Sequence, residues 1–119
     1  MLFCASITIS FAQPAAVDSR ISEVYGTYTS QLSVEQLQWL ENVLNRCEIV
    51  EQTATQVADL PLLSGVPMVE KFGSQDPALP ADPQQVNPLK YMIKFNKTEI
   101  NQYFRIDGTN YVLVVHKLD

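Results

Sequence analysis

The sequence predicts an α+β fold, with an N-terminal helical pair packed on a three- to four-stranded, mainly antiparallel sheet that ends in a C-terminal β-hairpin. Three observations predict it. A capped helix start at residues 33–36 is followed by apolar residues at helical spacing. Residues 89–95 alternate between apolar and mostly polar side chains, as a half-buried strand does. Two later apolar runs are separated by Asp-Gly, which indicates a hairpin.

Residues 1–12 form an apolar run that ends with small side chains at Ser10 and Ala12. Signal peptidases accept small side chains one and three residues before the cut, so we expect cleavage between Ala12 and Gln13. The stretch from Ser10 to Gln13 resembles the ends of bacterial export signals. No Lys or Arg precedes the run, and an N-terminal strand around Ile7 and Ile9 is the alternative. A bilayer span needs about 20 apolar residues, so the sequence predicts soluble export to the periplasm or the extracellular medium.

The remaining residues, 13–119, are expected to form one small domain. The chain has a net charge of −5, and both nucleic acid and anionic membrane surfaces need a basic footprint on their partners. Neither is therefore expected as a partner, and no cofactor motif is present: the four glycines are isolated, so no phosphate-binding loop is formed.

Two helices are predicted in the first half of the domain. Ser33 and Gln36 form a capping box, and Leu37, Leu40 and Leu44 follow at helical spacing, which predicts a helix from Val34 to about Arg46. A second, shorter helix is predicted over residues 20–25, because apolar residues recur there at the same spacing and Gly26 ends the pattern. Joined by residues 27–32, the two helices would form an αα-hairpin. A strand is expected over residues 48–52.

Six of the seven prolines lie in the second half, within an irregular Pro-rich segment at residues 59–88. Each proline lacks an amide donor and so interrupts a helix or a strand ladder. Such a long connection is either functional or mobile. A pocket for a small ligand is one hypothesis, between this segment and the helices.

Strands follow the Pro-rich segment. The first is predicted from Leu89 to Phe95, and the hairpin places Asp107 and Gly108 in a two-residue turn with Ile106 opposite Thr109. One face of the hairpin, called here the first face, is expected to pack against the capped helix; it carries Phe104, Ile106, Tyr111, Leu113 and Val115. The opposite, second face carries Tyr103, Arg105, Asn110, Val112, Val114 and His116. This second face is too apolar to lie open to water, so we expect either the Pro-rich segment or a partner protein to cover it.

Catalytic chemistry has few candidates. His116 is the only histidine, so centres built on several histidines are excluded. Signal cleavage would leave Cys47 as the single thiol. Reactive thiols favour the N-terminal end of a helix, whereas Cys47 follows the C-terminal end of the capped helix, in line with Leu40 and Leu44. The sequence therefore predicts a core cysteine.

The leading functional hypothesis is a non-catalytic interaction module of the bacterial cell envelope. Its possible interaction face comprises Tyr103, Arg105, Val112, Val114 and His116. The terminal strand, residues 111–116, is a second candidate if it lies at a sheet edge, where it could recruit a partner protein or form a homodimer. A small-ligand carrier is the first alternative, and a small enzyme using Cys47 and His116 is the second.

Overall fold

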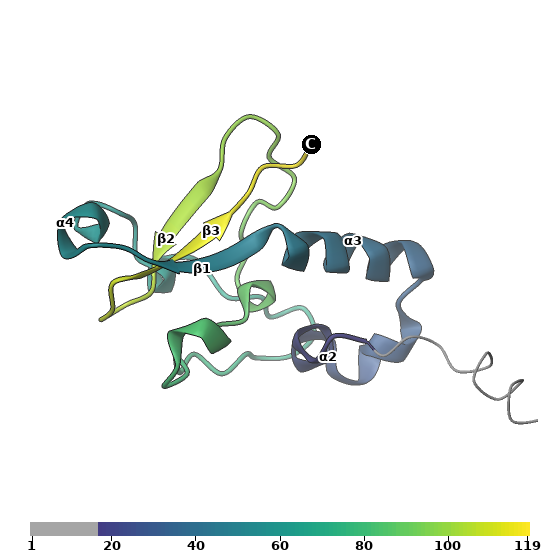
Figure 1. The fold of residues 1–119 in the computed structure, drawn as a ribbon. Coiled ribbons are helices and arrows are strands. Elements are labelled where there is room, and N and C mark those ends of the chain that lie inside the picture. The colour runs from purple at the N-terminus through teal and green to yellow at the C-terminus, as the bar shows by residue number, and fades with distance from the viewer. Residues whose placement is uncertain (1–16) are drawn as a thin grey trace, which may run out of the picture.

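The computed structural model describes residues 17–119, so the predicted signal peptide at residues 1–12 lies outside the described residues. Helices and a three-stranded antiparallel sheet make up the described region, which confirms the predicted α+β fold (Figure 1). In chain order the elements are α2 (Ser19–Tyr25), the 3-10 helix η1 (Gly26–Gln31), α3 (Val34–Asn45), β1 (Cys47–Glu51), α4 (Ala54–Val57), the 3-10 turns η2 (Leu63–Gly65), η3 (Pro83–Gln85) and η4 (Pro88–Lys90), β2 (Gln102–Arg105) and β3 (Tyr111–Val115).

Side-chain caps explain where the two longer helices begin. At the start of α2, the Asp18 carboxylate accepts a hydrogen bond from the backbone N–H of Arg20 at 2.9 Å. At the start of α3, Ser33 accepts from the N–H of Gln36 at 3.1 Å, and the Gln36 side chain accepts from the N–H of Ser33 at 2.8 Å. The predicted capping box and the predicted helix after it are both confirmed.

The strand order is β1-β3-β2, so the terminal strand lies at the centre of the sheet and not at an edge. Every backbone group of a central strand has a neighbour on one side or the other, which removes β3 as a template for further pairing. The edges are β1 and β2. A strand at residues 47–51 was expected from the sequence within one residue.

The two-residue turn predicted for the hairpin is wrong. Ile106 lies opposite Tyr111 and donates its N–H to the Tyr111 carbonyl at 2.9 Å, so residues 107–110 form a four-residue loop. Thr109 stabilises this loop, because its hydroxyl donates to the Ile106 carbonyl at 2.7 Å and accepts from the Tyr111 N–H at 3.0 Å. Because the register is shifted by two residues, each side chain keeps its predicted face.

The strand predicted over residues 89–95 is also wrong, because no ladder forms there. Residues 88–90 instead make the turn η4, in which the Asn87 side chain accepts from the N–H of Leu89 at 3.0 Å. Only one isolated bridge follows, between Met68 and Tyr91. The alternation is nonetheless real: Tyr91 and Ile93 are buried, while Met92 between them is exposed.

The first face of the sheet does not pack on α3, contrary to the sequence prediction. Residues of the Pro-rich segment and of the chain after it cover this face, forming a cluster that we call the sheet core. It contains Leu63, Val86, Tyr91, Ile93, Ile106, Leu113 and Val115. Only Arg46 separates α3 from β1, so the helix continues in line with the strand, beyond its end, and does not fold back over the sheet (Figure 1).

The helices form a cluster of their own, the helical core. It contains Ile21, Val24, Leu40, Val43, Leu44 and Leu89. Cys47 and Phe95 pack against both clusters and connect them. Arg46 fixes the same junction, because its guanidinium donates to the carbonyls of Phe95 and His116 at 2.8 Å each.

Candidate functional site

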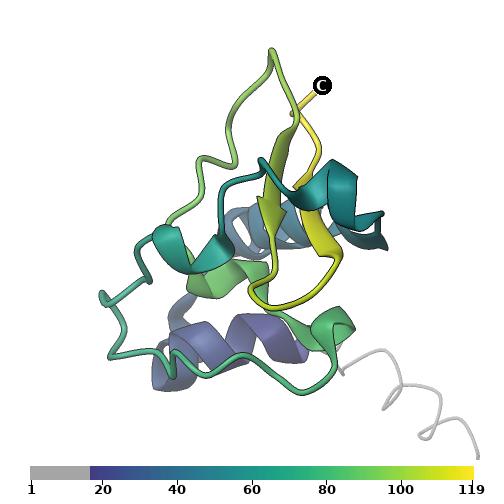
Figure 2. The same cartoon turned by 90° about the vertical axis from the view of Figure 1, so that its left-hand side faces the viewer.

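The second face of the sheet is covered by the chain itself. Val112 and Val114 are only 1% and 6% exposed, and they pack with Val57 of α4 and with Leu60. Leu60 lies in the Pro-rich segment, which is one of the two covers expected from the sequence. Figure 2 shows α4 and η2 on opposite sides of the strands. The two valine side chains therefore cannot serve as the contact surface for a partner.

Sequence reasoning missed α4, although a signal for it was present. Thr53 accepts from the N–H of Gln56 at 3.2 Å, and the Gln56 side chain accepts from the N–H of Thr53 at 2.9 Å. This is a second capping box, of the form Thr-x-x-Gln. The helix contains only four residues, so no apolar periodicity accompanies the cap.

The other candidate residues of the second face keep some exposed area. Tyr103 is 46% exposed. Arg105 is half-buried, and its guanidinium donates to the carbonyl of Thr109 at 2.8 Å. His116 is half-buried and bonds through Nε2 to the Glu48 carboxylate. A role in binding remains a prediction for these three residues.

Cys47 and His116 do not form a catalytic pair. Cys47 packs against the sheet core on the first face, whereas His116 contacts Glu48, the next residue along β1, whose side chain lies on the opposite face. Burial raises the pKa of the Cys47 thiol to about 11, an effect only partly opposed by the nearby charge of Arg46. A thiol of this kind is almost entirely protonated at neutral pH, so it is a poor nucleophile.

The outer edge of β1 is the clearest unpaired feature of the sheet. The N–H of His116 donates to the Arg46 carbonyl, and the N–H of Gln52 donates to the Asn110 carbonyl. Hydrogen bonding alternates along an antiparallel pair. The backbone N–H and C=O groups of the even-numbered residues of β1 therefore point towards β3, and those of the odd-numbered residues point outward. The outward groups belong to Cys47, Ile49 and Glu51. Within residues 17–119, the one hydrogen bond to them comes from the Gln84 side chain, whose Nε2 lies 3.3 Å from the Ile49 carbonyl oxygen.

The other sheet edge, at β2, is partly occupied by other segments of the chain. The outward N–H of Arg105 donates to the Pro61 carbonyl at 2.8 Å, and Leu62 forms a parallel bridge with the same residue. At the other end of β2, the Gln102 side chain donates to the Lys94 carbonyl at 2.7 Å. The Pro-rich segment therefore shields β2 at Arg105, and β1 is the more open edge.

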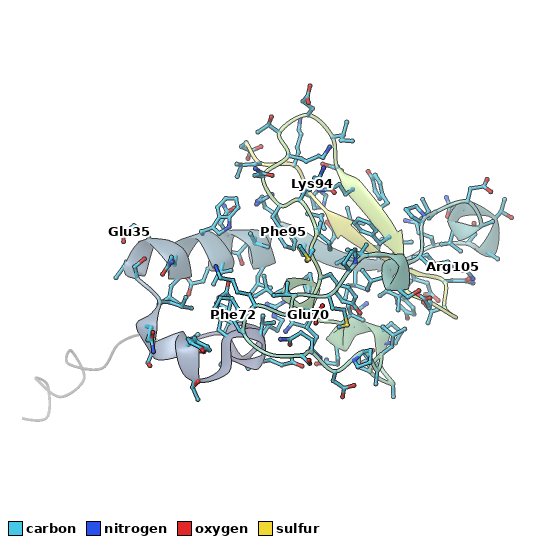
Figure 3. The ribbon with its side chains drawn as sticks, turned by 180° about the vertical axis from the view of Figure 1, so that it is seen from behind. Glu35, Glu70, Phe72, Lys94, Phe95 and Arg105 are labelled. Atoms are coloured by element: carbon cyan, nitrogen blue, oxygen red, sulfur yellow. The ribbon has the colours of Figure 1, made fainter. Side chains whose placement is uncertain are left out.

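An aromatic groove lies between the helices and the Pro-rich segment, where the sequence hypothesis of a ligand pocket placed one. It has a volume of about 630 Å³ and is lined by Tyr25, Tyr28, Trp39 and Phe72, among others. The ring of Phe72 lies 4.3 Å from that of Tyr25 and 5.5 Å from that of Tyr28, measured between centroids. Figure 3 shows Phe72 between the helices, with Glu35 at the end of α3 farther from the sheet. Tyr28 is 47% and Trp39 40% exposed.

Two further findings concern the described part of the chain. No helix in residues 17–119 has the length and apolar character needed to cross a bilayer. In the same range, no three His, Cys, Asp or Glu side chains gather as metal ligands would.

Comparison of the chain with protein-family models, with curated proteins and with solved structures found no match. Functional inference therefore depends on the geometry of the β1 edge and of the aromatic groove.

Proposed function

We propose that this protein is a non-catalytic interaction module of the bacterial cell envelope, exported as a soluble domain, that binds another polypeptide through the outer edge of β1. One observation carries the proposal: the backbone groups of Cys47, Ile49 and Glu51 face away from β3. Groups in this alternating arrangement are what a further strand pairs with when it joins a sheet.

One other feature supports this function over the enzyme alternative. Cys47 has a raised pKa and faces away from His116, so the two groups cannot act together as nucleophile and base. The predicted signal peptide would place the domain in the envelope or outside the cell, so the partner is to be sought there.

Site-specific cross-linking in the host tests the proposal. A photo-crosslinking amino acid is placed at Glu51, on the open edge, and at Glu41, an exposed position on α3, as the matched control. We expect a discrete protein adduct from position 51, in the envelope fraction, and none from position 41. Adducts of equal yield from both positions would contradict an interface at β1. The intact mass of the recovered protein tests export, because cleavage gives a chain that begins at Gln13.

A second candidate function, a small-ligand carrier, is favoured by the aromatic groove. Its volume of about 630 Å³ lies within the range of about 300–1,000 Å³ that small-molecule sites occupy. Trp39 lines the groove and is the only tryptophan, so its fluorescence reports directly on occupancy. A metabolite screen should then find a compound that changes this emission in the native protein and loses the effect in Tyr28→Ala. Compounds that act equally on both proteins would count against a groove site.

A further inference from the structure

Resting on the proposed function, we infer that the occupant of the β1 edge is an extended segment of a basic partner, with two basic residues three positions apart and two apolar residues between them. The sequence of β1 itself specifies this pattern. Glu48 and Glu51 are three positions apart, and Ile49 and Val50 separate them. A strand paired with β1 places one residue directly opposite each of these four.

The face on which each β1 side chain lies determines what the partner residue opposite it would contact. Glu48 points to the second face and Glu51 to the first, because side chains alternate along a strand. A partner residue opposite either glutamate would share its face, so one basic side chain is needed on each. Ile49 packs against the sheet core and Val50 against the cluster beneath α4. Apolar partner residues would extend both clusters by one position.

The charges around the edge favour a cation on both faces. Two cations lie near Cys47: Arg20 is paired with Asp18, at 2.9 Å between Nη2 and Oδ2, and the Arg46 guanidinium donates to the carbonyls of Phe95 and His116. His116 contacts Glu48 and carries a charge only when it is protonated. Glu51 is exposed. A second copy of this chain would bring the same two glutamates to the seam, and like charges across a strand pair are destabilising. The net charge of −5 adds to that repulsion.

Gln84 holds the place that a partner backbone would take. Its side-chain amide donates to the Ile49 carbonyl at 3.3 Å, and it lines a crevice of about 290 Å³ with Cys47, Ile49 and Val86. Gln84 is exposed, so its side chain can rotate away without unfolding any element. A backbone N–H of the partner would replace the amide at the same oxygen.

The test uses synthetic hexapeptides as probes of the full-length protein. The first has the sequence Thr-Lys-Val-Val-Lys-Thr with blocked ends, and the second replaces both lysines with glutamate. Two more peptides carry methyl groups on backbone amide nitrogens, one peptide at its odd-numbered residues and the other at its even-numbered residues. Because only one set of amides would face β1, exactly one methylated peptide should still bind. In ¹⁵N NMR titrations we expect shifts centred on Cys47, Ile49 and Glu51, and about tenfold weaker binding of the glutamate peptide.

Variants of the protein complete the test. Glu51→Lys should abolish the preference for the lysine peptide, because Glu48 and the new lysine then favour opposite peptides, whereas Glu99→Lys, with the same change of charge in an exposed loop, should not. Gln84→Ala should strengthen binding about threefold, because one competing hydrogen bond is removed. The inference is overturned if the glutamate peptide binds as well as the lysine peptide, or if shifts map away from β1. If position 51 still cross-links to a protein in the host while either of these results is found, the proposed function stands, but its partner is not of this basic class. Concentration-dependent shifts at β1 without peptide would identify a second copy as the occupant and also overturn the inference.

Discussion

Cys47 should react slowly with thiol reagents for as long as the protein is folded. Burial raises its pKa from 9.0 to about 11, which lowers the fraction of thiolate at neutral pH about a hundredfold. A more basic thiolate is also more nucleophilic, by about eightfold for this rise at a Brønsted coefficient of about 0.4–0.5. The two effects together leave a rate about tenfold below that of an exposed cysteine. Packing of the sulfur between the sheet core and the helical core slows it further.

The assay is the reaction with 5,5′-dithiobis(2-nitrobenzoic acid) at pH 7.5, in buffer and in urea. Peptide mass mapping separates Cys47 from Cys4, and the unfolded chain supplies the reference rate. We expect unfolding to accelerate labelling of Cys47 at least tenfold.

The stability of the protein has a related pH dependence. The folded thiol keeps its proton longer than the unfolded one, so stability falls as the pH rises from about 9 to about 11. Cys47→Ser should lack this loss.

One result would refute this reasoning. If folded Cys47 reacts at the unfolded rate near pH 7, and if His116→Gln slows the reaction, then the thiol is exposed and coupled to the imidazole. The small Cys/His enzyme would then become the leading hypothesis.

Three other changes test how the fold is held together. Asn87→Ala removes hydrogen bonds of 2.9 Å to the Arg20 carbonyl and to the Glu23 carboxylate, and urea unfolding should show a loss of about 2–3 kcal/mol. Val57→Ala leaves a void beneath α4, should cost about 2 kcal/mol, and should speed amide exchange in β3. The pKa of Glu23 is lowered mainly by its hydrogen bond from Lys90, so the stability that this pair contributes is lost as the pH falls through the lowered pKa. Glu23→Gln should flatten the thermal stability profile as the pH falls through and below 4.5, the ordinary pKa of this carboxyl; an unchanged profile would contradict the assignment.

Local chemistry made the helices predictable. The bonds of the Ser33 cap involve residues three positions apart, and the apolar stripe that follows depends on neighbours within the same helix. Sequence reasoning found α3 because everything that defines its start lies within a few residues.

Pairing between distant segments was harder to predict. Alternation over residues 89–95 correctly predicted which side chains are buried, but it could not show that no strand would lie beside them. The hairpin loop is held by bonds of the Thr109 hydroxyl and by bonds from Ser64 to the Asp107 carboxylate, and the second set joins segments 43 positions apart, so the usual preference of Asp-Gly for a two-residue turn did not decide the register.

The candidate site, too, could be predicted from the sequence only where neighbouring residues determine it. The second face was identified from its pattern, and a cover was expected, yet the identity of the cover depended on where α4 lies in space. The open edge at β1 could not be located from sequence, because strand order is set by contacts between residues about 65 positions apart, such as Cys47 with Val115. A groove does lie between the helices and the Pro-rich segment, whereas its use as a ligand site stays a prediction.

The central position of β3 has a consequence for the order of events during synthesis. β1 and β2 leave the ribosome first, but neither touches the other in the sheet, since each pairs only with β3. Until Tyr111–Val115 has emerged, the earlier strands have no ladder to join, although α3 can already form from its own cap. The nascent chain can thus begin to form a helix while the sheet is still unassembled, and β3 then completes both ladders of the three-stranded sheet together.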